Sequence, residues 1–460
     1  METRSEQKTT KLELLQFGFG GGGFNLINNG LVGMYFLFFM TDQAKIPAAI
    51  AGTYLLIGKF VQMFLYPVVG AFYDKTTTRW GRYRPYLLFV TPITAVLAVL
   101  LFSVVSGLSI TQKTVYYGAI YVAFCITCNI GVGLAMQSLI PLMSTDRTIR
   151  NFAVMSKQVI GNLGIAAGSA MVLPMVGFFS GTAQPWQAVA MVYGAILVLC
   201  MYICAYGVRR FDVGQETVAK KKSATFKEQI QILRVNKPLL FLACAYFFLL
   251  MSATITGSIS MYLYKYVIKQ PSLMVQLPML QLPFAIALGV AMPYIFKKIS
   301  KRTCFITAGV LLCIYPAVLV VFKPFANQFL ILGLGAFSIM LGGICAIIGW
   351  SILPDCIDYA EWKTGKRSDA LVTSCMSLAT SLGIATGPFL TGWLLSAIGY
   401  SGGVMMTQKM LDSILYIATI LPICCTLIAL IFMKLFPITD TFYNTMLAEL
   451  KEIRQAKQAL

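Results

Sequence analysis

Long stretches without a charged side chain are the feature that most constrains this sequence. No Asp, Glu, Lys or Arg occurs in residues 14–41, 114–145, 238–264, 270–296, 324–354 or 370–408. Each stretch is longer than the roughly 20 residues that an α-helix needs to cross the hydrocarbon core of a bilayer. Residues 158–208 form a still longer run and must contain two such helices, separated by a polar break at residues 180–185. The pattern predicts an all-α polytopic membrane protein.

Composition excludes several functional classes. The 460 residues are 58% hydrophobic and only 12% charged, whereas a soluble protein carries about 25% charged residues. The absence of His removes His-based metal sites, proton relays and catalytic bases. We interpret the twelve Cys as apolar packing residues, and we find no metal cluster or nucleophile–base pair. We therefore expect no enzyme activity, no cofactor and no bound metal.

The distribution of basic residues predicts the topology. We expect about twelve spans, and the junctions after the even-numbered spans are basic, whereas those after the odd-numbered spans are short and carry few charges. The net charge of +19 therefore faces an anionic inner leaflet and not nucleic acid. Both termini are predicted to be cytoplasmic. The expected spans are residues 14–41, 48–73, 86–108, 114–143, 152–178, 186–208, 238–264, 274–296, 304–322, 327–353, 369–397 and 411–435.

The chain divides into two sets of six spans. Residues 209–237 form the longest polar stretch and contain three consecutive lysines, Lys220 to Lys222. We predict an N-terminal six-helix bundle (1–208), a cytoplasmic linker (209–237), a C-terminal six-helix bundle (238–436) and a cytoplasmic tail (437–460). Similar loops recur at matching positions in the two halves, which is the organisation of a major-facilitator transporter.

Polar side chains inside the first two spans are candidates for a substrate site. Asn25 lies on one helical face with Asn28 and Asn29, and Lys59 shares a face with Gln62 and Tyr66. Amides and an ammonium group are costly at mid-membrane depth unless they face a partner or a wet cavity. The alternatives are interhelical hydrogen bonding for the asparagines and hydrogen bonds from Lys59 to backbone carbonyls.

Two loop motifs carry a family resemblance. They are residues 74–85 after the second span (DKTTTRWGRYRP) and residues 358–367 after the tenth span (DYAEWKTGKR), and residues 36–42 and 138–141 also match. With these motifs the whole chain resembles the glycoside–pentoside–hexuronide cation symporter family, the group that includes melibiose permease. The resemblance implies a major-facilitator fold, alternating access, and a sugar-type substrate bound between the halves.

The resemblance, together with the chemistry of charge pairing, also predicts a cytoplasmic gate. In this interpretation salt bridges between loops form when the inner side is closed. The alternative is a solvated set of loops that only fixes topology. The predicted gate residues are Asp74, Arg79, Arg82, Arg84, Arg150, Asp358, Glu361, Lys363 and Arg367.

The departures from the family pattern bear on the substrate. Sodium-coupled members carry two Asp on the face of the second span, where this chain has Gln62 and Tyr66. Na⁺ prefers hard oxygen ligands, so we expect the usual sodium site to be missing. By resemblance, positions of the family's site also correspond to Gln137, Lys157 and Ser381, and we add Asn129 of the fourth span. The predicted substrate-binding set is Asn25, Asn28, Asn29, Lys59, Gln62, Tyr66, Asn129, Gln137, Lys157 and Ser381.

Lys59 and Lys157 lack an evident carboxylate partner in the sequence, and an anionic substrate would stabilise them. We therefore predict a monomeric secondary transporter in the bacterial inner membrane that moves an acidic sugar, such as a hexuronide or a related sugar acid. The alternatives are a neutral glycoside or oligosaccharide symporter that uses a proton or an atypical cation site, and a sugar sensor on the same fold that transports nothing. The predicted partners are the sugar and the lipid bilayer.

Overall fold

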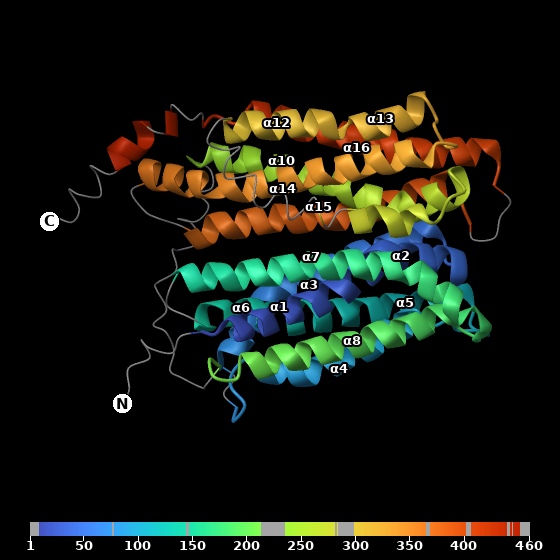
Figure 1. The fold of residues 1–460 in the computed structure, drawn as a ribbon, viewed down its shortest axis with the longest axis horizontal. Coiled ribbons are helices and arrows are strands. Elements are labelled where there is room, and N and C mark those ends of the chain that lie inside the picture. Colours follow the sequence, from blue (N-terminus) through green and yellow to red (C-terminus); the bar gives the residue numbers. More distant parts are fainter. Residues whose placement is uncertain are drawn as a thin grey trace. The chain divides into compact units, whose positions relative to one another are not determined.

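A computed structural model provides the structure of the chain, drawn in Figure 1. It describes residues 9–75, 78–143, 147–212, 235–280, 283, 299–364, 369–401, 406–438, 442–443 and 445–450. Nearly all of these residues are helical, and the only β-type pairing among them is an isolated bridge between Thr78 and Gly81. The all-α prediction is therefore confirmed.

Helices of the N-terminal part follow the predicted order, and two of the spans include π-helical turns (η2, η3 and η4) within the α-helix. The elements are α1 (Lys11–Asn25), η2 (Leu26–Gly33), α2 (Met34–Phe38), η3 (Phe39–Gln43), α3 (Ala48–Lys75), α4 (Arg84–Leu101), α5 (Ile110–Cys125), η4 (Ile126–Leu134), α6 (Ala135–Met143), α7 (Arg147–Phe178), the short 3₁₀ turn η5 (Phe179–Gly181) and α8 (Pro185–Gly207).

Helices of the C-terminal part include one further π-helical segment, η6. The described elements are α10 (Lys237–Tyr262), η6 (Leu263–Val267), α12 (Lys301–Leu312), α13 (Ile314–Val321), α14 (Gln328–Thr364), α15 (Asp369–Ala397) and α16 (Gln408–Lys434).

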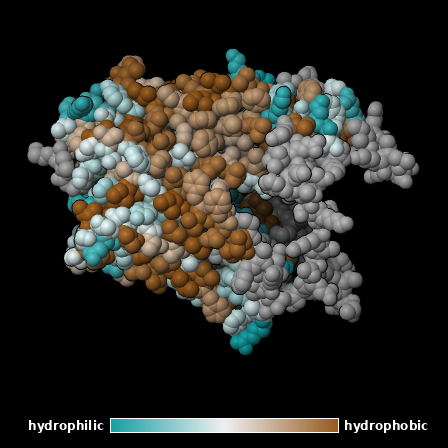
Figure 2. All heavy atoms as spheres, turned by 180° about the vertical axis from the view of Figure 1, so that it is seen from behind, coloured by the Kyte–Doolittle hydropathy of each residue, from teal (hydrophilic) through white to brown (hydrophobic). Residues whose placement is uncertain are grey.

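Eleven helical segments in the described residues are long and apolar enough to cross a membrane. They correspond to eleven of the predicted spans. Most of the remaining one, residues 274–296, lies outside the described residues, as do residues 213–234 of the predicted linker. Large apolar side chains such as Phe178 and Phe329 are more than 80% exposed. Figure 2 shows hydrophobic residues over much of the face that it presents, as expected for a surface in contact with lipid.

The chain forms two compact units. The first contains residues 1–218 together with Ser260–Leu282 and Pro388–Asp412, and the second contains the rest. The first unit therefore includes the six N-terminal spans, the segment η6, the last part of α15 and the first residues of α16. Helices α10, α15 and α16 each contribute residues to both units.

Glycines hold the helices of the first unit close together. In α1, a Cβ atom on Gly21 would lie 2.7 Å from the Lys157 carbonyl oxygen of α7, and a Cβ on Gly23 would lie 2.6 Å from Cys200 Cβ of α8. Gly30 of η2 packs in the same way on the backbone of Gly168. Small residues allow membrane helices to pack at backbone distance, so the glycine run from Gly18 to Gly23 places α1 between α7 and α8.

Candidate functional site

Four asparagine side chains of the first unit form a connected chain of hydrogen bonds. Asn29 Nδ2 donates to Asn25 Oδ1 at 2.6 Å, and Asn28 Nδ2 donates to Asn29 Oδ1 at 3.4 Å. Asn129 Nδ2, from the fourth span, donates to Asn28 Oδ1 at 3.4 Å. The bond between Asn129 and Asn28 is the interhelical hydrogen bonding that we named as the alternative. Asn29 is exposed, and its role in a substrate site stays a prediction.

The polar face of α3 joins this chain through Tyr66. Gln62 Nε2 donates to the Tyr66 hydroxyl at 3.3 Å, and Tyr66 donates to the Asn129 backbone carbonyl at 3.4 Å. The six residues Gln62, Tyr66, Asn129, Asn28, Asn29 and Asn25 are called the amide chain below.

One acceptor in the amide chain has no partner. Gln62 is only 9% exposed, and its Oε1 atom has no hydrogen bond in the described part of the chain. Exchanging the amide oxygen and nitrogen would leave the nitrogen unpartnered instead. A buried unsatisfied amide costs about 1–3 kcal/mol. A ligand group that hydrogen-bonds to Gln62 would remove this cost.

Several of these residues lie where the backbone is π-helical. Asn28 and Asn29 belong to η2, and Asn129 belongs to η4. A π-turn widens the helix and is frequent at functional sites. Gly30, Gly33, Gly131 and Gly133 occur in the same two segments.

Lys59 lies one helical turn before Gln62, on the same side of α3. The preceding residue, Gly58, lies against Tyr121 and Cys125 of α5, so this turn of α3 packs on the fourth span. Lys59 is half-buried, and among the described residues its ammonium group has neither a hydrogen-bond acceptor nor an acid within ion-pair distance. The structure therefore shows no bond from Lys59 to backbone carbonyls in these residues.

Lys157 is packed at the junction of three helices. Its backbone and Cγ lie against Gly21 of α1, and the neighbouring Gly20 lies against Cys204 of α8. One turn further along α7, Gly161 lies against the Asn25 side-chain amide, at 2.5 Å from a built Cβ to Nδ2. Lys157 likewise has no acid within ion-pair distance among the described residues. Lys59 thus lies one helical turn from Gln62 at one end of the amide chain, and Lys157 lies one turn from Gly161, which contacts Asn25 at the other end.

Two predicted substrate-binding residues are not linked to the amide chain. Gln137 of α6 belongs to the first unit and is exposed. Ser381 of α15 is half-buried and belongs to the second unit. Their roles remain predictions.

The loop before α4 is organised by a residue that the sequence interpretation did not select. Both carboxylate oxygens of Asp212 accept backbone N–H groups, from Arg82 at 2.9 Å and from Tyr83 and Arg84 at 2.7 Å. Asp212 is 3% exposed, and its carboxylate caps the positive end of α4. In the sequence, the feature that could have pointed to Asp212 is its position as the first acid after the basic pair Arg209-Arg210.

The predicted gate arginines of this loop bond within the first unit. Arg82 Nε donates to the Tyr73 carbonyl at 3.0 Å, and Arg84 Nε donates to the Ala205 carbonyl at 2.9 Å. Arg79 stacks on Trp80. The side chains of Asp74 and Arg150 lie outside the described residues, as does Arg367.

The remaining gate residues lie in the second unit. Tyr443 donates to Asp358 Oδ2 at 3.1 Å, and burial raises the pKa of the Tyr443 hydroxyl, so that it keeps this proton. Lys363 lies over the Trp362 ring, and Glu361 is half-buried. Salt bridges between these residues and the loop before α4 remain a prediction.

A second polar cluster of the first unit is centred on Asp42. Its Oδ1 atom accepts hydrogen bonds from Tyr266 at 2.6 Å and Tyr400 at 3.4 Å. Its Oδ2 atom accepts from Gln43 at 3.0 Å and from Lys265 Nζ at 3.2 Å. Burial raises the pKa of the Tyr400 hydroxyl, which favours its role as a donor.

Thr41 and Tyr262 extend this cluster, with 2.6 Å between their hydroxyl oxygens. Thr41, Asp42, Tyr262, Lys265, Tyr266 and Tyr400 are called the Asp42 cluster below. Asp42 lies in η3 and Lys265 in η6, so two π-helical segments meet here. The sequence interpretation did not select this cluster. In the sequence, the feature that could have pointed to it is that Asp42 directly follows the charge-free run 14–41 and Lys265 directly follows the charge-free run 238–264.

Comparison with known proteins identifies the family. The family described as MFS/sugar transport protein matches residues 16–440. The chain belongs to this family. It is a sugar transporter of the glycoside–pentoside–hexuronide kind and not an enzyme, which confirms the resemblance inferred from the two loop motifs.

Relatives of this transporter differ in the cargo that their names state. The isoprimeverose transporter of Lactiplantibacillus pentosus is 29% identical over 94% of this chain and 89% of its own length. The glucuronide carrier protein homolog of Escherichia coli (strain K12) is 25% identical over 93% of each chain. The fold of the nucleoside transporter NupG is similar, with a TM-score of 0.62 at 12% identity over 94% of this chain and all of that one. The protein is therefore a multi-pass membrane transporter with a major-facilitator fold.

Proposed function

We propose that this transporter moves an acidic sugar derivative, such as a hexuronide or a related sugar acid, across the bacterial inner membrane by alternating access. The observation that carries the proposal is the pair Lys59 and Lys157. Both lie inside candidate membrane spans, and neither has an acid within ion-pair distance among the described residues. An unpaired ammonium group inside a membrane protein costs free energy that an anionic substrate would recover.

Three acids of the first unit support this interpretation because their described contacts lie elsewhere. Glu13 pairs with Arg210 at 3.2 Å, Asp42 pairs with Lys265, and Asp212 binds the backbone before α4. The amide chain between the two lysines offers donors and acceptors of the kind that bind sugar hydroxyls. In this proposal the carboxylate of the sugar lies near Lys59, and its hydroxyls satisfy Gln62 and the exposed Asn29.

Coupling to sodium is not part of the proposal. Na⁺ needs hard oxygen ligands, preferably carboxylates, and the face of α3 presents Gln62 and Tyr66 beside the positive charge of Lys59. The same ammonium group would repel a cation bound there. The charge of the substrate itself, or a gradient of the substrate alone, would then drive transport.

The Asp42 cluster has a role in the alternating-access cycle under this proposal. By the positive-inside rule, the ends of helices opposite the basic loops face the outside, so both termini are cytoplasmic and Asp42 lies near the outer surface. The cluster joins a helix of the N-terminal part to η6 and Tyr400 of the C-terminal part. These contacts would close the outer end and separate when it opens.

The test is a panel of uptake and thermal-shift measurements on the purified full-length chain. We expect hexuronates and other sugar acids to raise the unfolding temperature and to enter proteoliposomes, at rates that are the same with Na⁺ and with K⁺. Neutral glycosides of the same size serve as matched ligands. Uptake of neutral sugars alone, or a saturable requirement for Na⁺, would contradict the proposal. Binding without uptake would indicate a sensor.

A further inference from the structure

A cavity of 680 Å³ in the second unit lies apart from the amide chain and is not used by the proposed function. Basic side chains of two helices contribute to its lining, Lys301 and Arg302 from the first turn of α12 and Lys434 from the last turn of α16. Asp355 of α14 is the one carboxylate among its lining residues. The described lining thus has three positive charges and one negative charge.

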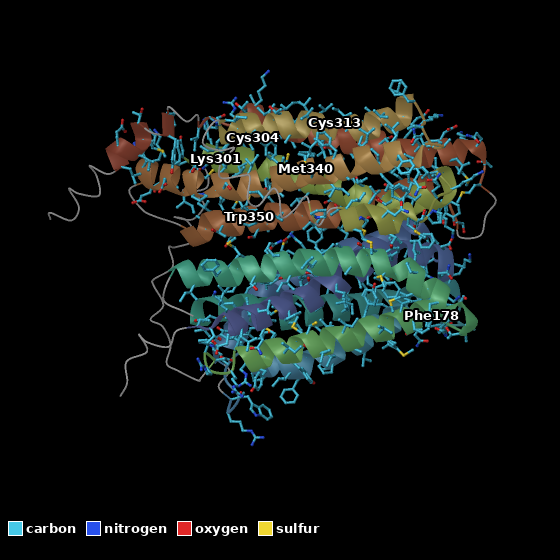
Figure 3. The ribbon with its side chains drawn as sticks, in the orientation of Figure 1. Phe178, Lys301, Cys304, Cys313, Met340 and Trp350 are labelled. Atoms are coloured by element: carbon cyan, nitrogen blue, oxygen red, sulfur yellow. The ribbon has the colours of Figure 1, made fainter. Side chains whose placement is uncertain are left out.

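Two basic residues of the cavity lie at the ends of candidate membrane spans. Lys301 is the first residue of the candidate span Lys301–Val321, and Lys434 is the last residue of the candidate span Gln408–Lys434. Figure 3 shows Lys301 where α12 begins. A helix of about 20 residues is enough to cross the hydrocarbon core, so residues at the two ends of such spans are expected near the boundary between hydrocarbon and headgroups.

The charges of the cavity are only partly neutralised. Lys301 Nζ lies 2.9 Å from Asp355 Oδ2, which accounts for one cation. Arg302 donates to the Lys434 backbone carbonyl, which carries no formal charge. The ammonium group of Lys434 has no partner among the described residues. Two cations, one of them beside the positive N-terminal end of α12, therefore have no acid within ion-pair distance among the described residues, and an anion would be favourable there.

The rest of the described lining is apolar or carries hydroxyl groups. Ile306, Ile352, Phe436 and Ile438 lie in the same cavity, together with the hydroxyl-bearing Ser300, Thr303 and Tyr443. The cavity therefore has a basic and hydroxyl-bearing part next to an apolar part. A phospholipid is divided in the same way, with a phosphate that would bind the first part and acyl chains that would bind the second. A free anion would use only the basic part.

We propose that this cavity binds an anionic phospholipid of the inner leaflet, with its phosphate near Arg302 and Lys434 and the start of an acyl chain near Ile306 and Phe436. Basic pockets at the cytoplasmic ends of membrane helices bind acidic headgroups by this chemistry. The contact between Arg302 and the end of α16 lies in the cavity, so a bound lipid would hold α12 and α16 together at this end.

Competition between lipids on the full-length protein tests the proposal. The protein is equilibrated with equal amounts of phosphatidylglycerol and phosphatidylcholine, and the bound lipids are counted by native mass spectrometry. We expect enrichment of phosphatidylglycerol, reduced about fivefold by Lys434→Gln and more strongly by the double substitution with Arg302→Gln, since each basic residue near the membrane surface contributes about that factor. Lys434→Gln keeps the backbone carbonyl that accepts from Arg302.

Lys237→Gln provides the matched control. Lys237 is an exposed lysine that begins the candidate span Lys237–Val267, and it does not line the cavity. This substitution should leave the enrichment unchanged. Equal enrichment in wild type and the Lys434 and Arg302 variants, with unfolding temperatures in phosphatidylcholine showing that all are folded, would overturn the proposal. Stabilisation by inorganic phosphate alone, lost in the same variants, would assign the site to a free anion instead of a lipid.

Discussion

Two lysines of the first unit, Lys59 and Lys265, lie inside candidate membrane spans in different surroundings. Lys265 lies 3.2 Å from Asp42, and its ammonium group also lies over the rings of Phe38 and Tyr266. Lys59 has no acid within ion-pair distance in the described part of the chain and lies beside a glutamine whose carbonyl oxygen is unpartnered. One cation has an acid partner, and the other has none among the described residues.

This difference separates a structural cation from a substrate-binding one. A satisfied pair stabilises the arrangement in which it forms, so its removal should change stability and the balance between conformations. An unsatisfied cation costs stability and is kept where function requires it. Substitution of Lys265 by methionine should therefore lower the free energy of unfolding, whereas the same substitution of Lys59 should not.

The largest effect is expected from Lys59→Ala on the transport of acidic sugars. A hydrogen bond to a charged group is worth about 1.5–3 kcal/mol, so the ratio kcat/KM for uptake should fall roughly 10- to 100-fold. Lys59→Arg keeps the charge and should stay within about tenfold of wild type. Proteoliposome uptake of a hexuronate measures both variants.

Neutral sugars provide the control for this prediction. If Lys59 binds a carboxylate, Lys59→Ala should change uptake of any neutral sugar much less than uptake of its acid counterpart. Equal losses of uptake for acidic and neutral sugars would show that Lys59 has a structural role. Lys59 and Lys265 would then no longer differ in function.

A smaller effect is expected from breaking the Asp42–Lys265 pair. The Asp42 side chain is 10% exposed, but that of Lys265 is 36% exposed, so solvent weakens the pair relative to a fully buried one. We expect Asp42→Asn and Lys265→Met each to lower the free energy of unfolding by about 1–2 kcal/mol. The double variant should lose less than the sum of the single variants, by about 1 kcal/mol.

Lys269→Met is the matched control for this cycle. Lys269 is an exposed lysine one turn after Lys265, with a φ of 60°, and it has no contact with Asp42. Its substitution should leave the unfolding midpoint within error of wild type. Additive losses in the Asp42 and Lys265 double variant would mean that the two charges do not interact.

Sequence periodicity predicted which residues share a helical face. Lys59, Gln62 and Tyr66 were expected on one side of the second span, and the bond from Gln62 to Tyr66 agrees with that for two of the three. The apolar runs and basic loops predicted the helical membrane fold because burial in lipid leaves few other choices for such segments.

Contacts between distant helices could not be predicted in the same way. A helical pattern gives the faces of one helix but not the neighbour that each face meets. Asn28 meets Asn129, and Asp42 meets Lys265 and Tyr400, across more than 100 residues of chain. The Asp42 cluster takes residues from three segments far apart in the chain, 41–42, 262–266 and Tyr400, and spacing within one segment does not show which other segment it meets.

The smallest effect, and the sharpest test of the contrast, is expected from Lys59→Met on stability. Methionine keeps the length and the apolar stem of lysine and removes an ammonium group that has no acid partner among the described residues. The free energy of unfolding should therefore stay the same or rise by up to about 1 kcal/mol, whereas Lys265→Met lowers it. Thermal unfolding of the two variants in the same detergent, without substrate, makes the comparison. A loss of stability in Lys59→Met as large as that in Lys265→Met would show that the protein satisfies Lys59, and the reason for an anionic substrate would then be lost.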